Sequence, residues 1–223
     1  MLESPSTTFS RCFLFPIALA IGLLPVSAQD DPKPGPAPVA EEKLKDVEAI
    51  IKTEKGDIKV SIYASKAPVT AANFLNLSKR DYYDGVTFHR VVEDFVIQGG
   101  DPSGTGRGGP GYFIENEIAP DMKHDRAGIL SMARKREPDT NGSQFFVTLG
   151  ATPHLDGGYS IFGEVLEGME VVTSIEEGDK ILDVEVLGST DALFTKLEKR
   201  LNEWNAILDE RAKAQKAATE PQP

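Results

Sequence analysis

The sequence predicts a mainly β protein: a closed antiparallel barrel with a helix at each end and a helical extension at the C-terminus. Short runs of alternating or β-branched apolar residues recur through the middle of the chain, separated by glycine-rich turns. From residue 191 onward a helical periodicity replaces this alternation. With 223 residues and a hydrophobic content of 40%, the chain can form one well-cored domain plus tails.

The strand candidates begin with a pair at residues 47–53 and 58–63, which flank Glu54-Lys55-Gly56-Asp57, a sequence typical of a hairpin loop. Strict alternation in the next candidate would place Phe88 and Arg90 on one face. The later candidates are residues 86–91, 95–98, 129–133, 145–149, 159–165 and 181–187.

Three segments have helical patterns. Residues 67–77 form the first, with Pro68 suited to an initial turn, and residues 168–175 form a shorter one. The third spans residues 191–218. Its apolar stripe either packs on the barrel or binds a partner, including a second copy; both interpretations stay open. The stripe consists of Phe194, Leu197, Leu201, Trp204 and Leu208.

The N-terminal region has the pattern of an export signal. Arg11 precedes an apolar run, and small residues at its end offer a cleavage site after residue 28. We therefore expect a periplasmic or extracellular protein, with membrane contact only if the segment stays uncleaved as an anchor. The only cysteine, Cys12, lies in this segment, so the mature chain would have no disulfide. The predicted organisation is a signal peptide at 1–28, a Pro-rich linker at 29–45, a folded domain at 46–190 and a helical tail at 191–223.

Several classes of function are disfavoured. The net charge of −11 argues against a nucleic-acid partner. The three histidines lack close metal-ligand spacing, and we expect neither a metal nor another cofactor. The glycines at 104, 106 and 109 match a dinucleotide-binding pattern, but no helix is predicted to follow, which favours a surface loop. Composition alone offers no support for a Ser-His-Asp triad.

A set of motifs, in order and at compatible spacing from about residue 47 to 188, resembles the cyclophilins, a family of peptidyl-prolyl isomerases. The chain looks like an exported, bacterial-like member. The motifs are Phe88-His89-Arg90, Phe95-Val96-Ile97-Gln98-Gly99-Gly100-Asp101, Leu130-Ser131-Met132-Ala133, Asn141-Gly142-Ser143-Gln144-Phe145-Phe146, His154-Leu155-Asp156-Gly157 and Phe162-Gly163.

The resemblance implies a closed eight-stranded barrel that accelerates rotation about X-Pro bonds in exported polypeptides and so assists their folding. It implies that Arg90 is the catalytic arginine, with Gln98 beside it. The residues it implies for substrate binding are Phe95, Val96, Ala133, Arg134, Gln144, Phe146, His154, Leu155 and Tyr159. The alternative is a module that binds proline-containing peptides, or acts as a chaperone, without turnover.

Two departures from the family pattern affect the proposed pocket. Val96 stands where methionine is common, and His154 replaces the tryptophan of cyclosporin-sensitive members. We therefore expect weak cyclosporin binding, because a large aromatic hydrogen-bond donor is missing.

Overall fold

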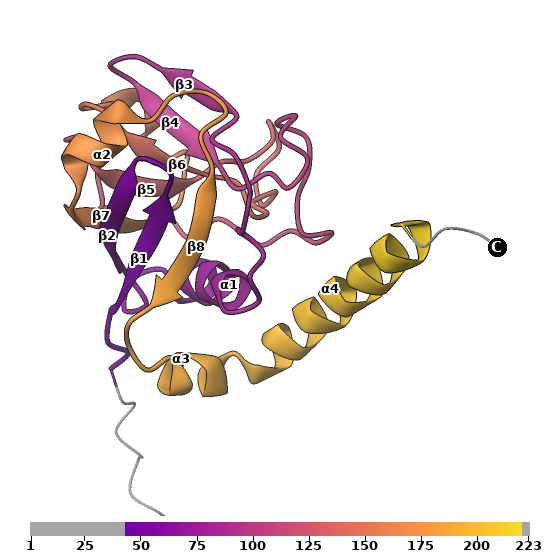
Figure 1. Ribbon diagram of the computed structural model, residues 1–223. Helices are drawn as coiled ribbons and strands as arrows, with labels where there is room; N and C mark the ends of the chain where they lie inside the picture. The colour runs from indigo at the N-terminus through magenta and orange to yellow at the C-terminus, as the bar shows by residue number, and fades with distance from the viewer. Residues whose placement is uncertain (1–42, 220–223) are drawn as a thin grey trace, which may run out of the picture. The chain divides into compact units, whose positions relative to one another are not determined.

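The structure is a computed structural model that describes residues 43–219. These residues form one eight-stranded antiparallel sheet with helices around it (Figure 1). The strands are β1 (Val47–Thr53), β2 (Gly56–Ile62), β3 (Arg90–Val92), β4 (Val96–Gly99), β5 (Ile129–Met132), β6 (Phe145–Thr148), β7 (Ile161–Glu167) and β8 (Ile181–Val186). Each strand candidate supplies one of them, so a mainly β, antiparallel fold is confirmed.

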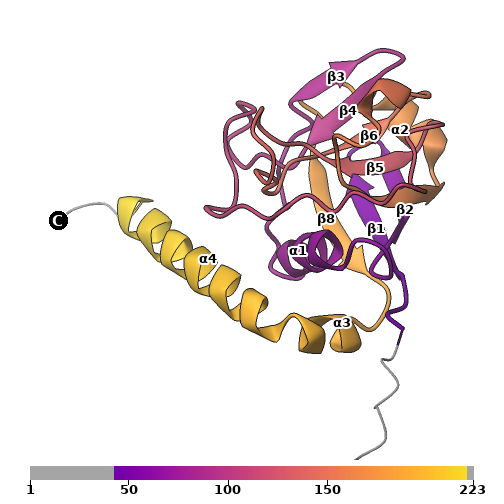
Figure 2. The same cartoon turned by 180° about the vertical axis from the view of Figure 1, so that it is seen from behind.

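The helices are named in the same order. They are α1 (Pro68–Ser78), the 3₁₀ helix η1 (Pro153–Leu155), α2 (Met169–Ser174), α3 (Asp191–Lys196) and α4 (Glu198–Thr219). Figure 2 shows α1 beneath the sheet and α2 toward its other end, as two end helices would lie.

The sheet is a curled half-barrel, so a fully closed barrel is not confirmed. Its order is β3-β4-β6-β5-β7-β2-β1-β8, and the end strands β3 and β8 do not pair along their lengths. A single bridge, Thr87 to Lys180, joins the two edges, supported by a hydrogen bond of 2.9 Å from Phe88 N–H to the Asp179 carbonyl. A strand was expected at residues 86–91, but β3 contains only the three residues Arg90–Val92. Residues 86–89 therefore form no continuous ladder with β8, and the edges stay open.

This shortening also corrects the predicted faces of Phe88 and Arg90. Phe88 is 1% exposed and belongs to the core, whereas Arg90 is exposed on the outer surface. Strict alternation fails because Phe88 and His89 precede β3 and have no regular strand conformation.

An aromatic cluster joins α1 to the inside of the sheet. The Phe74 ring of α1 lies with its centroid 5.5 Å from that of Phe145 on β6 and 5.2 Å from that of Phe162 on β7. Tyr83 completes the cluster at 5.3 Å from Phe74. Each fully buried aromatic side chain contributes roughly 2–3 kcal/mol, so this cluster holds α1 firmly against the interior face of the sheet.

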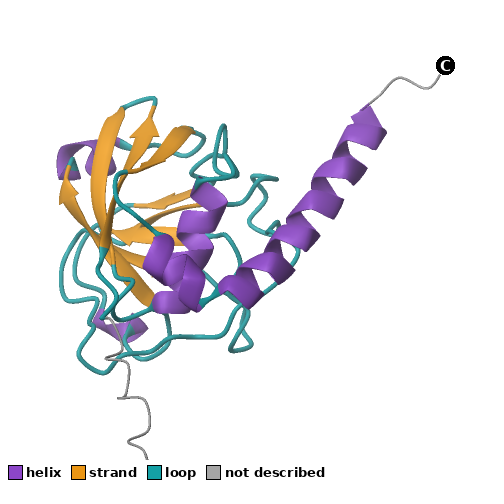
Figure 3. Cartoon of the chain, turned by 90° about the horizontal axis from the view of Figure 1, so that it is seen from below, coloured by secondary structure: helices purple, strands orange, loops and turns teal. Residues whose placement is uncertain are grey.

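The C-terminal extension is two helices, where the sequence predicted one. α3 ends before Leu197, whose backbone angles (φ −113°, ψ 18°) leave the helical range. Figure 3 shows the last helix, α4, running past the barrel toward the C-terminus. Three residues of its apolar stripe, Leu201, Trp204 and Leu208, are buried and belong to the core cluster of the barrel. The Trp204 ring stacks on Tyr112 with centroids 5.4 Å apart and planes only 5° from parallel.

Polar contacts fix α4 along the same face. Asn76 Nδ2 of α1 donates to Asn205 Oδ1 at 3.0 Å, and Arg200 pairs with Glu115 at 2.7 Å. Arg80 and Asp209 form a further ion pair. The stripe therefore packs on the barrel, which is the first of the two interpretations, and binding of a partner through the C-terminal helix stays a prediction.

The predicted signal peptide (1–28) and nearly all of the predicted linker (29–45) lie outside the described residues. Within residues 43–219, none of the helices combines the length and apolar character needed to cross a membrane.

Candidate active site

Pairing of β3 with β4 places Arg90 directly opposite Gln98. The Arg90 guanidinium points an N–H at Gln98 Oε1 over 3.4 Å, a long hydrogen bond. Gln98 Nε2 donates to Gln144 Oε1 at 3.0 Å, and Gln144 Nε2 donates to the Gly108 carbonyl at 3.0 Å. This series of bonds orients the Gln98 amide so that its oxygen faces Arg90. Since Gln98 accepts only one of the five guanidinium N–H groups, the others can bind a substrate.

Phe95 lies beneath the guanidinium in the turn between β3 and β4. The Arg90 Cζ atom is 5.7 Å from the centroid of its ring, within range of a cation–π interaction. His154 stacks on the same ring with centroids 5.4 Å apart and an interplanar angle of 22°. The structure therefore brings Arg90, Phe95 and His154 together, although His154 is distant in sequence.

Val96 and Phe146 form an apolar floor on the outer face of the sheet. They are 2% and 5% exposed, yet neither belongs to the interior core that contains Ile97, Phe145 and other alternate residues. Phe146 lies opposite Gln98 in the pairing of β4 with β6. Alternation therefore places the floor and the polar groups on one surface.

Tyr159 meets the other side of Phe146, edge to face, with centroids 5.8 Å apart. Arg134 Cζ lies 5.0 Å from the Tyr159 ring centroid, and its Nε donates to the Gly158 carbonyl at 2.8 Å. Its NH1 group is directed at three successive carbonyls, of residues 135–137. Arg134 thus ties two loops together at the edge of the floor.

Two predicted site residues, Ala133 and Leu155, are placed at the site by hydrogen bonds of their backbone N–H groups. Ala133 N–H donates to the Gln144 carbonyl at 2.9 Å, which places this segment next to the polar series. Leu155 follows His154 on η1 and is half-buried, and its N–H donates to the Thr152 carbonyl at 2.9 Å.

A buried, hydrogen-bonded Ser-His-Asp group supports the floor. His124 Nδ1 lies 3.1 Å from Asp156 Oδ1, and its Nε2 lies 3.1 Å from Ser131 Oγ. Both Ser131 and His124 are 0% exposed, so a substrate cannot reach the hydroxyl. The His124 ring instead stacks on Phe146 at 5.9 Å and holds it in place.

The protonation of this group follows from its surroundings. Burial lowers the pKa of His124, and the nearby Asp156 carboxylate only partly opposes this, so the ring is neutral near pH 7. The backbone N–H of His124, at 2.8 Å, lowers the pKa of Asp156 and keeps it ionised.

The glycine-rich segment at 101–111 is a loop arranged around one carboxylate. Asp101 is 1% exposed and accepts hydrogen bonds from the N–H groups of Ser103, Thr105 and Gly108. Burial alone would raise the pKa of Asp101, but hydrogen bonds from the N–H and hydroxyl of Ser103 and from the N–H of Gly108 lower it below its usual value. The loop leads into no helix, and its task here is to present the Gly108 carbonyl to Gln144.

Sequence reasoning missed three contributors: the Gly108 carbonyl, the His124 group and Arg211 of α4, which lines a hollow beside Gln98. Arg211 follows Trp204 by seven residues and Leu208 by three, so helical periodicity could have placed it on the inner face. No local pattern could have joined His124 to Ser131 and Asp156. Across residues 43–219, no three His, Cys, Asp or Glu side chains gather closely enough to hold a metal ion.

Comparison with known families agrees with this geometry. The family described as "Cyclophilin type peptidyl-prolyl cis-trans isomerase/CLD" matches residues 49–190. The chain belongs to the cyclophilin family of peptidyl-prolyl cis-trans isomerases. The match does not distinguish an exported, bacterial-like member from other cyclophilins, so this subtype stays a prediction.

Cyclophilins from distant organisms are similar over most of their own length. A peptidyl-prolyl cis-trans isomerase-like 1 from Rhizopus delemar is 56% identical over 163 residues, covering 72% of this chain and 93% of that protein. Peptidyl-prolyl cis-trans isomerase A from Mycobacterium tuberculosis is 44% identical over 156 residues, covering 62% of this chain and 85% of that protein.

Solved cyclophilin structures share the fold. A cyclophilin-type isomerase from Cryptosporidium parvum is 38% identical, with a TM-score of 0.62, and the match covers 65% of this chain and 99% of that one. The same enzyme crystallised in the presence of the dipeptide Ala-Pro gives a TM-score of 0.60 at 39% identity, covering 64% of this chain and 99% of that one. The family binds proline-containing peptides.

Proposed function

We propose that the outer groove around Arg90 catalyses cis–trans rotation about X-Pro bonds in exported polypeptides and thereby assists their folding. One observation carries this proposal: an exposed guanidinium is held by Gln98 and Phe95 beside the apolar floor of Val96 and Phe146. A proline ring on the floor would bring its nitrogen close to the guanidinium N–H groups.

Rotation about the peptide bond needs no bond cleavage, so a nucleophile is not required. The barrier is about 18–20 kcal/mol because resonance gives the C–N bond partial double-bond character. Uncatalysed exchange of X-Pro bonds takes about 10–100 s. A rate gain of about 10⁵ would require lowering that barrier by roughly 7 kcal/mol.

Arg90 is assigned the stabilisation of the twisted bond. As resonance is lost, the prolyl nitrogen becomes pyramidal and its lone pair, no longer delocalised into the carbonyl, accepts a hydrogen bond from the guanidinium. The planar ground state lacks this acceptor, so the bond favours the transition state over the substrate. One charge-assisted hydrogen bond supplies only part of the 7 kcal/mol estimate, and positioning on a rigid floor supplies more.

The remaining predicted site residues are assigned to binding. Phe95, Val96, Phe146 and Leu155 would hold the proline ring, while Ala133 and Arg134 would contact the peptide backbone. Gln144, His154 and Tyr159 would border the groove. This distribution is supported by the apolar floor and by the polar groups along one of its sides.

Export of the protein is part of the proposal and rests on the sequence. Arg11 precedes the apolar run at 13–26, and Val26-Ser27-Ala28 ends it with small residues. Detection of a mature chain that begins near Gln29 outside the cytoplasm, by N-terminal sequencing, would support this location. A full-length chain recovered only from the cytoplasm would contradict it.

Exchange NMR on the purified mature protein tests the activity itself. With an Ala-Ala-Pro-Phe peptide, catalysis broadens or exchanges the cis and trans resonances at substoichiometric protein. A non-catalytic binding module would instead shift resonances without increasing the exchange rate, and that outcome would overturn the proposed enzyme.

A further inference from the structure

The hollow beside Gln98 adjoins the proposed proline groove. It has a volume of about 660 Å³ and shares Gln98, Ala133, Arg134 and Gln144 with the groove. Its far side is formed by the loop at 106–113 and by Arg211 of α4. A peptide that occupies the groove would therefore extend into this hollow within a few residues, since an extended chain advances about 3.3 Å per residue.

The charge of the hollow is opposite to that of the protein. Its lining, all within the described residues, includes four cations and no Asp or Glu: the cations are Arg107, Arg134, Lys135 and Arg211. The whole chain carries a net charge of −11. A concave, one-signed lining concentrates its field and favours an anion in the hollow.

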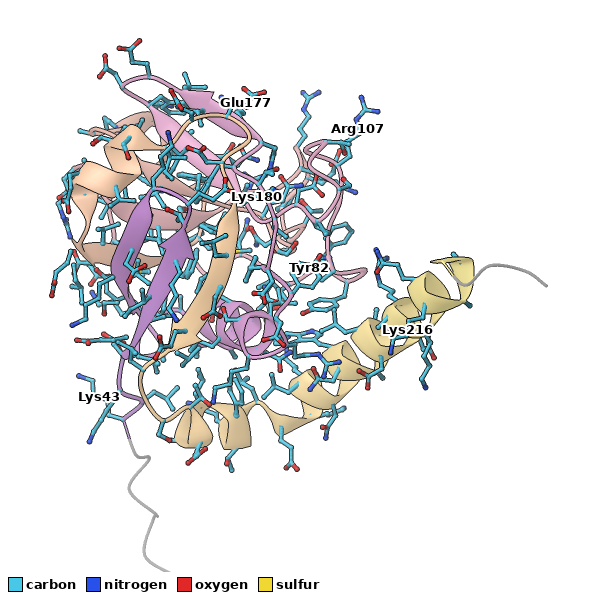
Figure 4. The ribbon with its side chains drawn as sticks, in the orientation of Figure 1. Lys43, Tyr82, Arg107, Glu177, Lys180 and Lys216 are labelled. Atoms are coloured by element: carbon cyan, nitrogen blue, oxygen red, sulfur yellow. The ribbon has the colours of Figure 1, made fainter. Side chains whose placement is uncertain are left out.

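The four cations differ in how far their own contacts occupy them. Arg134 is bonded to carbonyls, and Lys135 lies with its Nζ 4.6 Å from the Phe113 ring centroid. Arg107 and Arg211, by contrast, form no ion pair with any carboxylate among residues 43–219. Figure 4 labels Arg107 on the loop side of the barrel, the side toward which α4 extends. These two guanidinium groups retain donors for a ligand.

Arg211 is positioned by the helix that lies outside the family match at 49–190. Stacking of Trp204 on Tyr112 fixes the helix, and Arg211 then lies against Gly111. A Cβ atom at Gly111 would come within 2.7 Å of Arg211 Cδ, and its φ of +99° also suits glycine. The loop thus leaves room for this arginine at the border of the hollow.

We propose that the hollow binds the carboxylate of an Asp or Glu side chain close in sequence to the substrate proline, and that Arg211 determines this specificity. The inference rests on the proposed function, because the groove must hold a proline for the neighbouring side chain to enter. Bidentate pairing with a guanidinium favours carboxylate over an amide of equal size, and lysine is repelled. For a partly exposed pair we expect a preference of about three- to tenfold.

The test uses matched proline peptides in an alanine background. Glu, Gln or Lys is placed in turn at each of three positions on either side of the proline, and kcat/KM is measured by exchange NMR on the mature protein. At one position or more, we expect Glu to exceed Gln by about three- to tenfold and Lys to be slowest. This ratio should shrink as salt rises from 0.05 to 0.5 M, since exposed charges are screened.

Two charge reversals on the same helix locate the effect. Arg211→Glu should abolish the Glu preference or turn it toward Lys. Lys213→Glu changes the net charge equally but is exposed and lies outside the hollow, so the wild-type ratio should remain. Arg211→Gln, which keeps helical propensity, repeats the test if the reversal disturbs α4 by circular dichroism.

The outcomes separate this inference from the isomerase activity. Turnover of the alanine peptide with equal kcat/KM for Glu and Gln at every position would overturn the specificity, as would a ratio unchanged in Arg211→Glu. If no peptide is turned over, the isomerase proposal fails, and Kd values from NMR titration of the same peptides decide the specificity instead. A Glu preference in Kd that Arg211→Glu removes would still support the hollow as a carboxylate site.

Discussion

At the scale of single residues, Gln98 connects the exposed Arg90 to the hydrogen bonds of Gln144 and the Gly108 carbonyl. Its amide accepts from Arg90 and donates to Gln144, which is itself held by the Gly108 carbonyl. The arrangement limits the directions in which the guanidinium can point without occupying all of its donors.

Replacing Gln98 with Leu should therefore lower kcat/KM about tenfold, mainly through kcat, because Arg90 loses its orienting acceptor while the apolar floor remains. Stopped-flow or exchange NMR measurements of kcat and KM would separate the two terms. Gln98→Glu, which keeps an acceptor for Arg90, should retain more activity. A loss confined to KM would contradict a positioning role.

His154 bears on inhibitor binding. It is exposed and stacks on Phe95, where a tryptophan would add an indole N–H donor. We expect His154→Trp to tighten cyclosporin inhibition about tenfold relative to wild type, the equivalent of one hydrogen bond. Nanomolar inhibition of the wild type would contradict the expected weak binding.

The sequence predicted the individual site residues through family motifs, whereas the contacts between distant residues came only from the structure. Arg90, Gln98 and Phe95 are close in sequence, so their proximity was accessible to strand reasoning. The stacking of Phe95 on His154 joins residues 59 positions apart, and the support of Phe146 by His124 joins residues 22 apart. Local patterns contain no information about such contacts.

At the scale of elements, the His124 group links the loop before β5 to the segment after η1. Its pKa shifts have a definite consequence for stability. Folding holds His124 neutral, while the unfolded chain binds a proton below a pH of about 6.5, so acidification favours unfolding. Asp156, whose pKa is lowered, adds stability above its unfolded value of about 3.9 that is lost at lower pH.

We expect the free energy of unfolding to decline as the pH falls below about 6.5, with a second decline in the range where Asp156 is protonated. Urea unfolding at several pH values measures this, and NMR titration of the His124 ring identifies the group. A ring that titrates above 6.5 would contradict the assignment to burial.

The packing of α4 gives another measurable quantity. Trp204 is 6% exposed and stacks on Tyr112, so Trp204→Ala should reduce the free energy of unfolding by about 2–4 kcal/mol. The exposed neighbour Glu203→Ala should change it by less than about 0.5 kcal/mol. Equal urea midpoints for wild type and Trp204→Ala would show that the helix does not stabilise the barrel.

The elements themselves were largely predictable from alternation and periodicity. β1 matches its expected bounds, and α1 begins and ends one residue later than the expected helix. Where the prediction failed, long-range contacts were involved: residues 85–88, which precede β3, hydrogen-bond to residues 178–181 and do not continue the β3–β4 ladder. The helix break at Leu197 was not predicted, because no proline or glycine lies near it in the sequence.

At the scale of the whole molecule, the curled sheet gives the groove a rigid base. The interior face holds the aromatic core, and the outer face of β4 and β6 presents the floor, so one alternating pattern serves both stability and binding. The extension outside the family match adds Arg211 to the lining of the hollow beside Gln98. Catalysis and the proposed substrate preference are thus assigned to different segments of the chain.

The central claim is that the Arg90 guanidinium stabilises the twisted X-Pro bond. The most direct measurement is kcat/KM of Arg90→Ala by exchange NMR, with Arg126→Ala as a matched exposed arginine outside the groove. We predict that Arg90→Ala loses about 10²–10³-fold in kcat/KM, as when one transition-state donor is removed, with an unchanged fold and similar peptide binding. Turnover near that of the wild type in a folded Arg90→Ala protein would contradict the claim.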